Sequence, residues 1–259
     1  MGKLFSVTNE SDNIVRIELT NGIKHNPLSL ELIRNLTKAL QDISAQNKVK
    51  VIIISSEGPG FSAGHDLEEL RQNKNNKVFF KTLFDDCSKL MQTIMHLPNP
   101  VIAEVCGIAA AAGCQLVASC DLAIASDQSS FMTPGVNIGL FCSTPMVAVS
   151  RNLSRKKIME MLLTGEKLSA KEAVQYGLIN YHVPLNQLQI KTLNLAKVIA
   201  KKPSSTVKIG KEAFYKQVDM PISEAYQYTS EIMAKNMMEI DAQEGITAFL
   251  DKRAPKWKV

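Results

Sequence analysis

The chain lacks three features that would assign it to whole classes of protein. It has no run of about 18 apolar residues, which argues against a membrane-spanning helix, and no CxxC pair of the kind that zinc and redox sites use. It also has no block of like charges, since 30 Lys and Arg residues are spread among 25 Asp and Glu residues for a formal net charge of +5. We therefore expect neither a nucleic-acid partner nor a membrane partner, whereas a small anionic ligand suits this mild charge.

The cysteines show no pairing pattern, and no secretory signal precedes them. Unpaired cysteines are typical of compartments that keep thiols reduced. The sequence therefore predicts a cytoplasmic protein, or a mitochondrial one if a targeting segment has been removed. We expect no metal, and we expect the thiols to act as small apolar filler in the core. The cysteines are Cys87, Cys106, Cys114, Cys120 and Cys142.

The pattern of apolar residues divides the chain into two parts. At 259 residues, with 45% hydrophobic and 21% charged residues, the chain is long enough to bury a sizeable core. Strand and helix patterns alternate up to Ser154 and helical patterns follow, which predicts βα units with right-handed crossovers and a helical C-terminal portion. The predicted strands are 4–10, 13–20, 49–56, 100–107 and 121–126; the predicted helices are 26–47, 79–97, 154–165, 169–177 and 185–202, then two more up to Phe249.

Two glycine-rich loops each join a buried strand to a helix, which is where open α/β sheets bind ligands. The first loop is "EGPGFSAGHDLEEL", residues 57–70, and the second loop is "GIAAAAGCQLVASCD", residues 107–121. A helix start offers unpaired N–H groups, so one amide from each loop could converge on a carbonyl oxygen as an oxyanion hole. Taken singly, each loop is also compatible with plain packing.

The order of several motifs resembles the crotonase superfamily, the enoyl-CoA hydratase/isomerase family, over nearly the whole chain. The matching motifs are "IKHNPLSLEL", "VKVIIISSEGPGFSAGHDLEEL", "PVIAEVCGIAAAAGCQLVASCDLAIAS", "LLTGEKLSAKEAVQYGLIN" and "EGITAFLDKRAPKW". The segments "AAGCQLVASCD" and "TPGVNIGLFCSTP" are most similar to the family's branch of enoyl-CoA hydratase domain-containing proteins.

The resemblance implies an α/β fold of the ClpP/crotonase type, a spiral of ββα units with a C-terminal helical region. It implies a core over residues 1–195 and a trimerisation region over 196–259, with trimers that often pair into hexamers. It also implies hydratase or isomerase activity in fatty acid metabolism on an acyl-CoA thioester. Coenzyme A is then part of the substrate, so no separate cofactor is expected.

The resemblance also implies the residues of the site. The backbone N–H groups of His65 and Ala112 would form the oxyanion hole, and Lys24 would lie near the CoA phosphates. The His65 side chain is then free to face solvent, which is the role we expect for it. The other residues expected to bind the thioester and the adenine end are Ala63, Asp66, Leu67, Glu68 and Gly113.

Three positions where relatives carry acids are vacant. Hydratases of this family move protons with two glutamates, and those positions align with Gln115 and Gly135. An aspartate used by other members aligns with Ser143. Gln115 can hold a water molecule but cannot take its proton. Ordinary hydration should therefore be slow, while binding should survive.

Three further polar residues lie near the two loops in sequence. Asp66 precedes "LEEL" and is a good N-cap for that helix. Glu104 stands in an apolar strand, where it could pair at a subunit contact or line the pocket. Cys142 fits packing better than a nucleophile because no His is evident beside it.

Three functions remain open on these residues. The chain could be an enzyme that polarises a thioester and moves the proton by an unusual path. It could instead be a non-catalytic acyl-CoA binding or regulatory protein, or more weakly an oligomeric scaffold. The residues Gln115 and Gly135 are the features that distinguish an enzyme from a non-catalytic binding protein. The two glycine-rich loops are the feature that distinguishes both of these from a scaffold.

Overall fold

The computed structural model describes residues 4–11 and 13–258. Within these residues the strands form a six-stranded sheet and a four-stranded sheet. The chain passes from one sheet to the other and back, so that pairs of strands alternate with helices. This is the predicted spiral of ββα units. The six-stranded sheet has the order β1 (Phe5–Asn9), β2 (Ile14–Leu19), β3 (Val51–Ser56), β5 (Val101–Val105), β7 (Leu122–Ser126), β10 (Tyr181–Val183).

The strand directions follow from the connections. The first two predicted strands form a hairpin, since β1 and β2 pair antiparallel with Phe5 opposite Leu19. Every later neighbour in this sheet pairs parallel, as strands joined by helices do. The four-stranded sheet is parallel except for its last strand. Its order is β4 (Gly60–Ser62), β6 (Ile108–Ala110), β8 (Ser130–Met132), β9 (Leu168–Ser169).

The helices form where the apolar spacing predicts them. In α1 the side chain of Ser29 caps the N-terminus by accepting from the Leu32 amide, and Leu32, Leu36 and Leu40 face the core. Ser169 and Glu172 form a capping box at the start of α7. The helices are α1 (Leu30–Ser44), α2 (Leu67–Gln72), α3 (Lys77–His96), α4 (Ala112–Ser119), α5 (Pro145–Val149), α6 (Arg155–Thr164), α7 (Ala170–Tyr176), α8 (Leu185–Ala200), α9 (Ser204–Gln217), α10 (Ile222–Met237) and α11 (Ile240–Leu250), with 3₁₀ turns η1 (Gly22–Lys24) and η2 (Pro134–Ile138).

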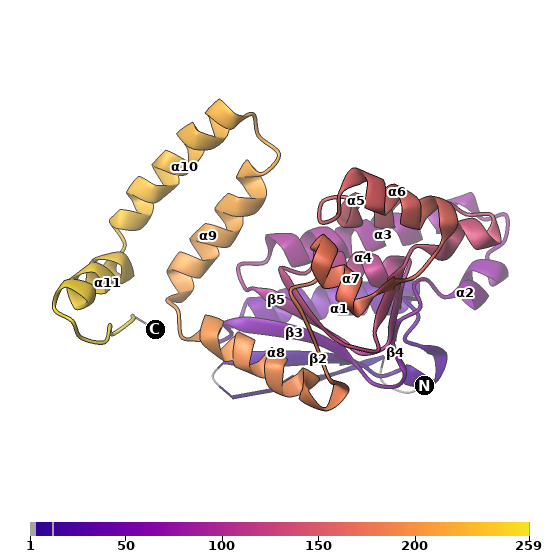
Figure 1. Cartoon of the computed structure of the whole chain (residues 1–259), viewed down its shortest axis with the longest axis horizontal. Helices are drawn as coiled ribbons and strands as arrows, with labels where there is room; N and C mark the ends of the chain where they lie inside the picture. Colours follow the sequence, from indigo (N-terminus) through magenta and orange to yellow (C-terminus); the bar gives the residue numbers. More distant parts are fainter. Residues whose placement is uncertain (1–3, 12, 259) are drawn as a thin grey trace.

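The C-terminal arm, residues 204–250, extends away from the sheets (Figure 1). The described residues contain three helices after α8, so the prediction of two is wrong. Pro221 marks one break, but the other falls at Met238 and Glu239, where no glycine or proline signals it. The predicted boundary after residue 195 falls inside α8, and the buried Ala196 and Ala200 of α8 pack on the six-stranded sheet.

A buried ionic group joins the arm to the core. Lys211 on α9 donates to Asp121 at 2.6 Å, and the Tyr215 hydroxyl donates to the other Asp121 oxygen at 3.0 Å. Lys211 also donates to the carbonyls of Ile94 and Asn99, each at 2.9 Å. Burial raises the pKa of Asp121 and lowers the pKa of Lys211 despite their attraction, because desolvation is the largest cause of both shifts. We call Lys211, Asp121 and Tyr215 the arm cluster.

Candidate functional site

A cavity of about 450 Å³ opens where the two glycine-rich loops meet. Its walls are mainly apolar, and no charged side chain is present among the described residues that line it. A cavity of this kind suits an uncharged, apolar group such as an acyl chain. The lining residues are Ala63, His65, Leu67, Leu70, Phe84, Ala111, Ala112, Pro134, Gly135, Asn137, Ile138, Leu140, Phe141, Cys142, Ser143, Thr144 and Pro145.

The first loop is held rigidly against the segment that follows η1. The Ala63 amide donates to the His25 carbonyl at 2.8 Å, and the Leu28 amide donates to the Gly64 carbonyl at 2.7 Å. Gly64 has φ of +90°, a conformation in which a side chain would be strained. These bonds fix the direction of the peptide that carries the His65 amide.

Asn26 organises this contact, a role that the sequence analysis did not identify. The residue is fully buried and adopts a positive φ of 50°, which Asn tolerates better than most residues. Its side-chain amide donates to the carbonyls of Glu57 and Gly60, at 3.0 and 2.9 Å. Its own carbonyl accepts from the Ser62 hydroxyl at 2.8 Å. In the sequence Asn26 is only a polar residue before Pro27, a pattern that is common in ordinary turns.

The second loop turns sharply into α4. Ala111 adopts φ 48° and ψ −116°, a region that non-glycine residues rarely occupy and that costs about 1–3 kcal/mol. The first bond of the helix joins the Gln115 amide to the Ala111 carbonyl at 3.0 Å. The amide of Ala112, the first residue of the helix, therefore has no acceptor inside α4.

Small residues bring the two loops into contact. A methyl group added at Gly64 would lie 3.0 Å from the Ala111 Cβ and 3.3 Å from the Ala112 amide nitrogen. One added at Gly113 would lie 2.4 Å from the Ser62 carbonyl oxygen, too close for any side chain. The predicted Gly113 therefore packs α4 against the first loop and does not line the cavity. The amides of His65 and Ala112 stand on the two sides of this contact.

The His65 side chain does not face solvent, so that expectation is wrong. Its Nδ1 lies 3.3 Å from the Leu28 carbonyl oxygen, and its ring meets the edge of Phe84 with 5.3 Å between centroids. Its Nε2 is buried and has no hydrogen-bond partner among the described residues. Burial lowers the pKa of the imidazole, because desolvation outweighs the bond to Leu28.

Three predicted binding residues lie outside the cavity lining, on the surface beside it. Lys24 and Glu68 are bonded to each other at 2.8 Å, and both are exposed. The Asp66 carboxylate accepts from the amides of Glu68 and Glu69, so the prediction that it caps a helix is confirmed. Of the residues expected to bind substrate, Ala63 and Leu67 line the cavity with His65.

The three vacant acid positions occupy different places. Gln115 on α4 is buried, and its Oε1 has no hydrogen-bond partner among the described residues, but it does not line the cavity. Gly135 in η2 and Ser143 do line it. The Ser143 hydroxyl is exposed and donates to the Phe141 carbonyl at 3.3 Å, so no base activates it.

The backbone around Gly135 leaves no space for a side chain. An added Cβ would lie 2.9 Å from the Leu140 carbonyl oxygen and 3.0 Å from the Cys142 sulfur. We expect Gly135→Ala to destabilise the fold by about 1–3 kcal/mol, as overpacking does. The matched control is Gly210→Ala on the exposed side of α9, where no atom lies within 4 Å of the new methyl group. Urea unfolding of both variants tests this, and equal stability of the two would contradict it.

The surroundings of Glu104 and Cys142 fit structural roles better than catalytic ones. Glu104 does not line the cavity: Arg16 donates to its two oxygens at 2.6 and 3.2 Å, and the pair is buried in the six-stranded sheet. Sequence spacing could not show this, because β2 and β5 are separated by β3. Cys142 lines the cavity, no histidine of the described part of the chain is bonded to it, and burial raises the pKa of its thiol. A thiol in this state is a poor nucleophile at neutral pH.

Two groups of cavity residues escaped the sequence analysis. Phe84 and Leu70 belong to helices whose orientation depends on tertiary packing. The segment 137–141 forms an exposed apolar rim that reads in the sequence as a plain loop. Leu140 folds back because its amide donates to the Gly135 carbonyl at 2.9 Å.

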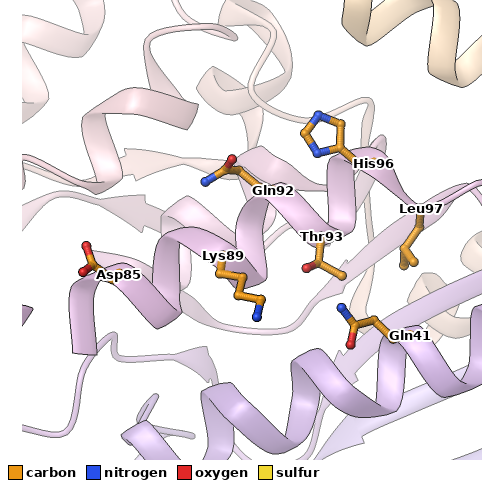
Figure 2. A pocket seen from close by; sticks show the side chains of 7 residues that line it. All are labelled: Gln41, Asp85, Lys89, Gln92, Thr93, His96 and Leu97. Carbon is orange, nitrogen blue, oxygen red and sulfur yellow. The ribbon is translucent and has the colours of Figure 1, made fainter. Parts of the chain in front are cut away.

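A second hollow, of about 360 Å³, lies between α1 and α3 (Figure 2). Most of the residues that line it are polar, with Gln41 from α1 facing Lys89 and Thr93 from α3, and neither glycine-rich loop contributes to the lining. Across residues 4–11 and 13–258 no cluster of three potential metal ligands occurs, nor any helix with the length and hydropathy to cross a membrane.

Comparison with known proteins agrees with this architecture. The profile described as Enoyl-CoA hydratase/isomerase matches residues 9–259. Human enoyl-CoA hydratase domain-containing protein 3, mitochondrial, is 51% identical over 95% of this chain and 81% of its own length. The crystal structure of human enoyl coenzyme A hydratase domain-containing protein 3 has a TM-score of 0.95 and 49% identity over 98% of this chain and 100% of that one. A Mycobacterium smegmatis enoyl-CoA hydratase structure has a TM-score of 0.96 and 41% identity, covering 99% of both chains. By sequence and by fold, this chain belongs to the enoyl-CoA hydratase/isomerase family of the crotonase superfamily.

Proposed function

We propose that the protein binds an acyl-CoA thioester and holds the thioester carbonyl between the backbone amides of His65 and Ala112. The observation that carries the proposal is the contact of the two loops at the mouth of an apolar cavity. Two amides aimed at one oxygen stabilise the negative charge that develops when a thioester becomes an enolate. The strained turn at Ala111 supports this role, since such strain collects at functional sites.

The acyl group is uncharged. A substrate with a carboxylate at the far end of its chain would need a cation in the cavity, and the described lining residues supply none. At the other end of the ligand, Lys24 is the cation we propose for the CoA phosphates, in exchange for its exposed bond to Glu68. Such an exposed ion pair is weak, so a phosphate can replace the carboxylate at little cost.

Hydration of a conjugated thioester is not the reaction that this cavity favours. No carboxylate lines the cavity among the described residues, and each missing acid or base costs about 10² to 10⁴ in rate. The alternative function is a non-catalytic acyl-CoA binding or regulatory protein, which the vacant positions Gln115 and Gly135 favour. Both functions share the bound thioester and differ in turnover.

We expect the purified protein to bind butyryl-CoA in calorimetry but to hydrate crotonyl-CoA far more slowly than a two-glutamate hydratase of the same family. The reason is that the amides polarise the carbonyl while no carboxylate activates the water. Loss of the ultraviolet absorbance of the conjugated double bond of crotonyl-CoA measures hydration. Absence of any butyryl-CoA binding would contradict the proposed function, and hydration at ordinary rates would contradict the role given to Gln115 and Gly135.

The arm is proposed as the surface on which copies of this chain assemble into trimers or dimers of trimers. Large apolar side chains are exposed along all three of its helices. Soluble monomers rarely expose so much apolar surface in one region, and such surfaces usually mark protein–protein contacts. They include Phe214, Ile222, Tyr226, Met233, Ile240, Phe249 and Leu250. Light scattering after size exclusion should give three or six times the 28.6 kDa chain mass, and a monomer would contradict this.

No cofactor beyond the CoA of the substrate enters this proposal. The proposed location follows the relatives: of the cytoplasmic and mitochondrial alternatives, the mitochondrial one is supported by the name of the human protein.

A further inference from the structure

The apolar wall of the cavity continues outward onto the segment between η2 and α5. Ile138, Leu140 and Phe141 all line the cavity, yet their side chains are 59%, 54% and 45% exposed. A single exposed apolar residue is ordinary in a soluble protein, whereas several together beside a cavity mark a surface that a ligand or a partner covers. We call Ile138, Leu140 and Phe141 the cavity rim.

Backbone hydrogen bonds hold the cavity rim in place although it lies on the surface. The Gly139 amide donates to the Val136 carbonyl at 3.3 Å, and the Leu140 amide donates to the Gly135 carbonyl at 2.9 Å. Gly139 adopts the left-handed φ of +76° that this turn requires. A ligand that covers the rim therefore meets a backbone that is already ordered, which lowers the entropy cost of binding.

The two ends of the proposed ligand leave the oxyanion hole in different directions. The sulfur and the α carbon are attached to different sides of the carbonyl carbon, so the acyl chain diverges from CoA. Lys24 and Glu68 place the CoA end beside the start of α2, whereas the cavity rim precedes α5. Figure 1 shows α2 at the right-hand edge of the core and α5 nearer to its middle. The acyl chain therefore has the cavity rim as its outer wall.

We propose that the cavity rim binds the outer part of a medium-chain acyl group, so that the protein selects medium-chain over short-chain acyl-CoA thioesters. This inference rests on the proposed function, because it needs an acyl-CoA thioester in the cavity. The cavity, at about 450 Å³, lies in the range of volumes that enclose a whole small-molecule ligand. A butyryl group has only four carbons, so it would leave Ile138 and Phe141 in water. A longer chain fills the cavity and covers them.

A second copy of the chain is the other occupant that an exposed apolar surface suggests. The acyl chain is favoured because the three rim residues also line the cavity, so that one chain can follow both surfaces without a break. The surface proposed for assembly is the C-terminal arm, which extends away from the core that carries the rim (Figure 1). The described lining residues carry no charge, which suits a hydrocarbon chain.

The test is calorimetry of the full-length protein with butyryl-, hexanoyl-, octanoyl- and decanoyl-CoA. Each CH₂ group that leaves water lowers Kd about fourfold when it is fully buried, and about twofold when an open rim covers one side of it. We therefore expect Kd to fall by about 10²-fold or more from butyryl- to decanoyl-CoA. Excess butyryl-CoA should displace decanoyl-CoA, because both occupy one cavity.

The double variant Ile138→Ser, Phe141→Ser removes two apolar side chains of the rim. We expect it to weaken decanoyl-CoA by about tenfold and to change the Kd of butyryl-CoA less than about twofold. The matched control is Val147→Ser on α5, where the side chain is 51% exposed and does not line the cavity. We expect this control to leave both Kd values unchanged. Circular dichroism and light scattering check that each variant folds and keeps the wild-type mass.

Three results would overturn the inference while leaving the proposed function intact. The first is equal affinity of the wild-type protein for butyryl- and decanoyl-CoA, or decanoyl-CoA that butyryl-CoA does not displace. The second is an equal loss of affinity for both ligands in the rim variant. The third is an altered mass of the rim variant with its chain-length dependence unchanged, which would make the rim a subunit contact. Failure of the wild-type protein to bind any of the four thioesters would instead overturn the proposed function itself.

Discussion

Ala112→Pro should reduce α-hydrogen exchange of butyryl-CoA by about 10²- to 10³-fold, the effect of removing one donor from an oxyanion hole. Proline has no N–H, and its fixed φ is accepted at the first position of a helix, which is where Ala112 stands in α4. The substitution therefore removes the donor with little direct cost to the helix. The exchange assay in D₂O measures the effect.

The matched variant is Ala112→Gly, which removes the methyl group but keeps the amide. We expect it to retain the larger part of the wild-type exchange rate. Circular dichroism and thermal unfolding of both variants check that α4 still forms. Unchanged exchange in a folded Ala112→Pro protein would show that this amide does not hold the carbonyl.

Lys211→Met should destabilise the protein by about 3–5 kcal/mol, because it leaves the Asp121 carboxylate buried without its cation. It also removes the donor to the Ile94 and Asn99 carbonyls. The control is Lys208→Met, one turn earlier on α9, where the lysine is exposed and a change within about 0.5 kcal/mol is expected. Urea unfolding at one protein concentration compares the two free energies of unfolding.

The double variant Lys211→Met, Asp121→Leu separates the ion pair from the other bonds of the arm cluster. Desolvation is the largest cause of the pKa shift of both groups, so removing both charges should cost less than the sum of the single changes. Full additivity would show that Lys211 and Asp121 do not act as a pair. A loss of trimer with little loss of unfolding free energy would show that the arm cluster positions the arm without stabilising the core.

The spacing of apolar residues and the capping residues predicted most of the long strands and helices, because both signals act within a few residues of the element they form. The segments 4–10 and 13–20, in which apolar and polar residues alternate, form a hairpin. The mainly apolar segment 49–56 contains the buried strand β3. Asp66 caps the helix that its position predicts. The third helix of the arm was missed because no breaker residue marks the turn before it.

The surroundings of individual polar side chains could not be predicted in this way. Glu104 looked like a residue of the pocket or of a subunit contact, but Arg16 from a strand two places away in the sheet neutralises it. His65 looked free to face solvent, but the packing of Phe84 and the Leu28 carbonyl bury it. Such partners are distant in sequence and become neighbours through the sheet order for Glu104 and through the packing of α3 and the segment after η1 for His65.

The sequence by itself determined the family, five of the strands of the six-stranded sheet, most of the helices, and which acid positions hold Gln115, Gly135 and Ser143, because these depend on residue identity and short-range spacing. The tertiary structure alone decided that the two glycine-rich loops touch, that the buried Nε2 of His65 has no partner among the described residues, and that no charged side chain occurs among the described residues lining the cavity. These features arise where segments far apart in the chain pack together, and packing depends on the whole fold rather than on any local pattern.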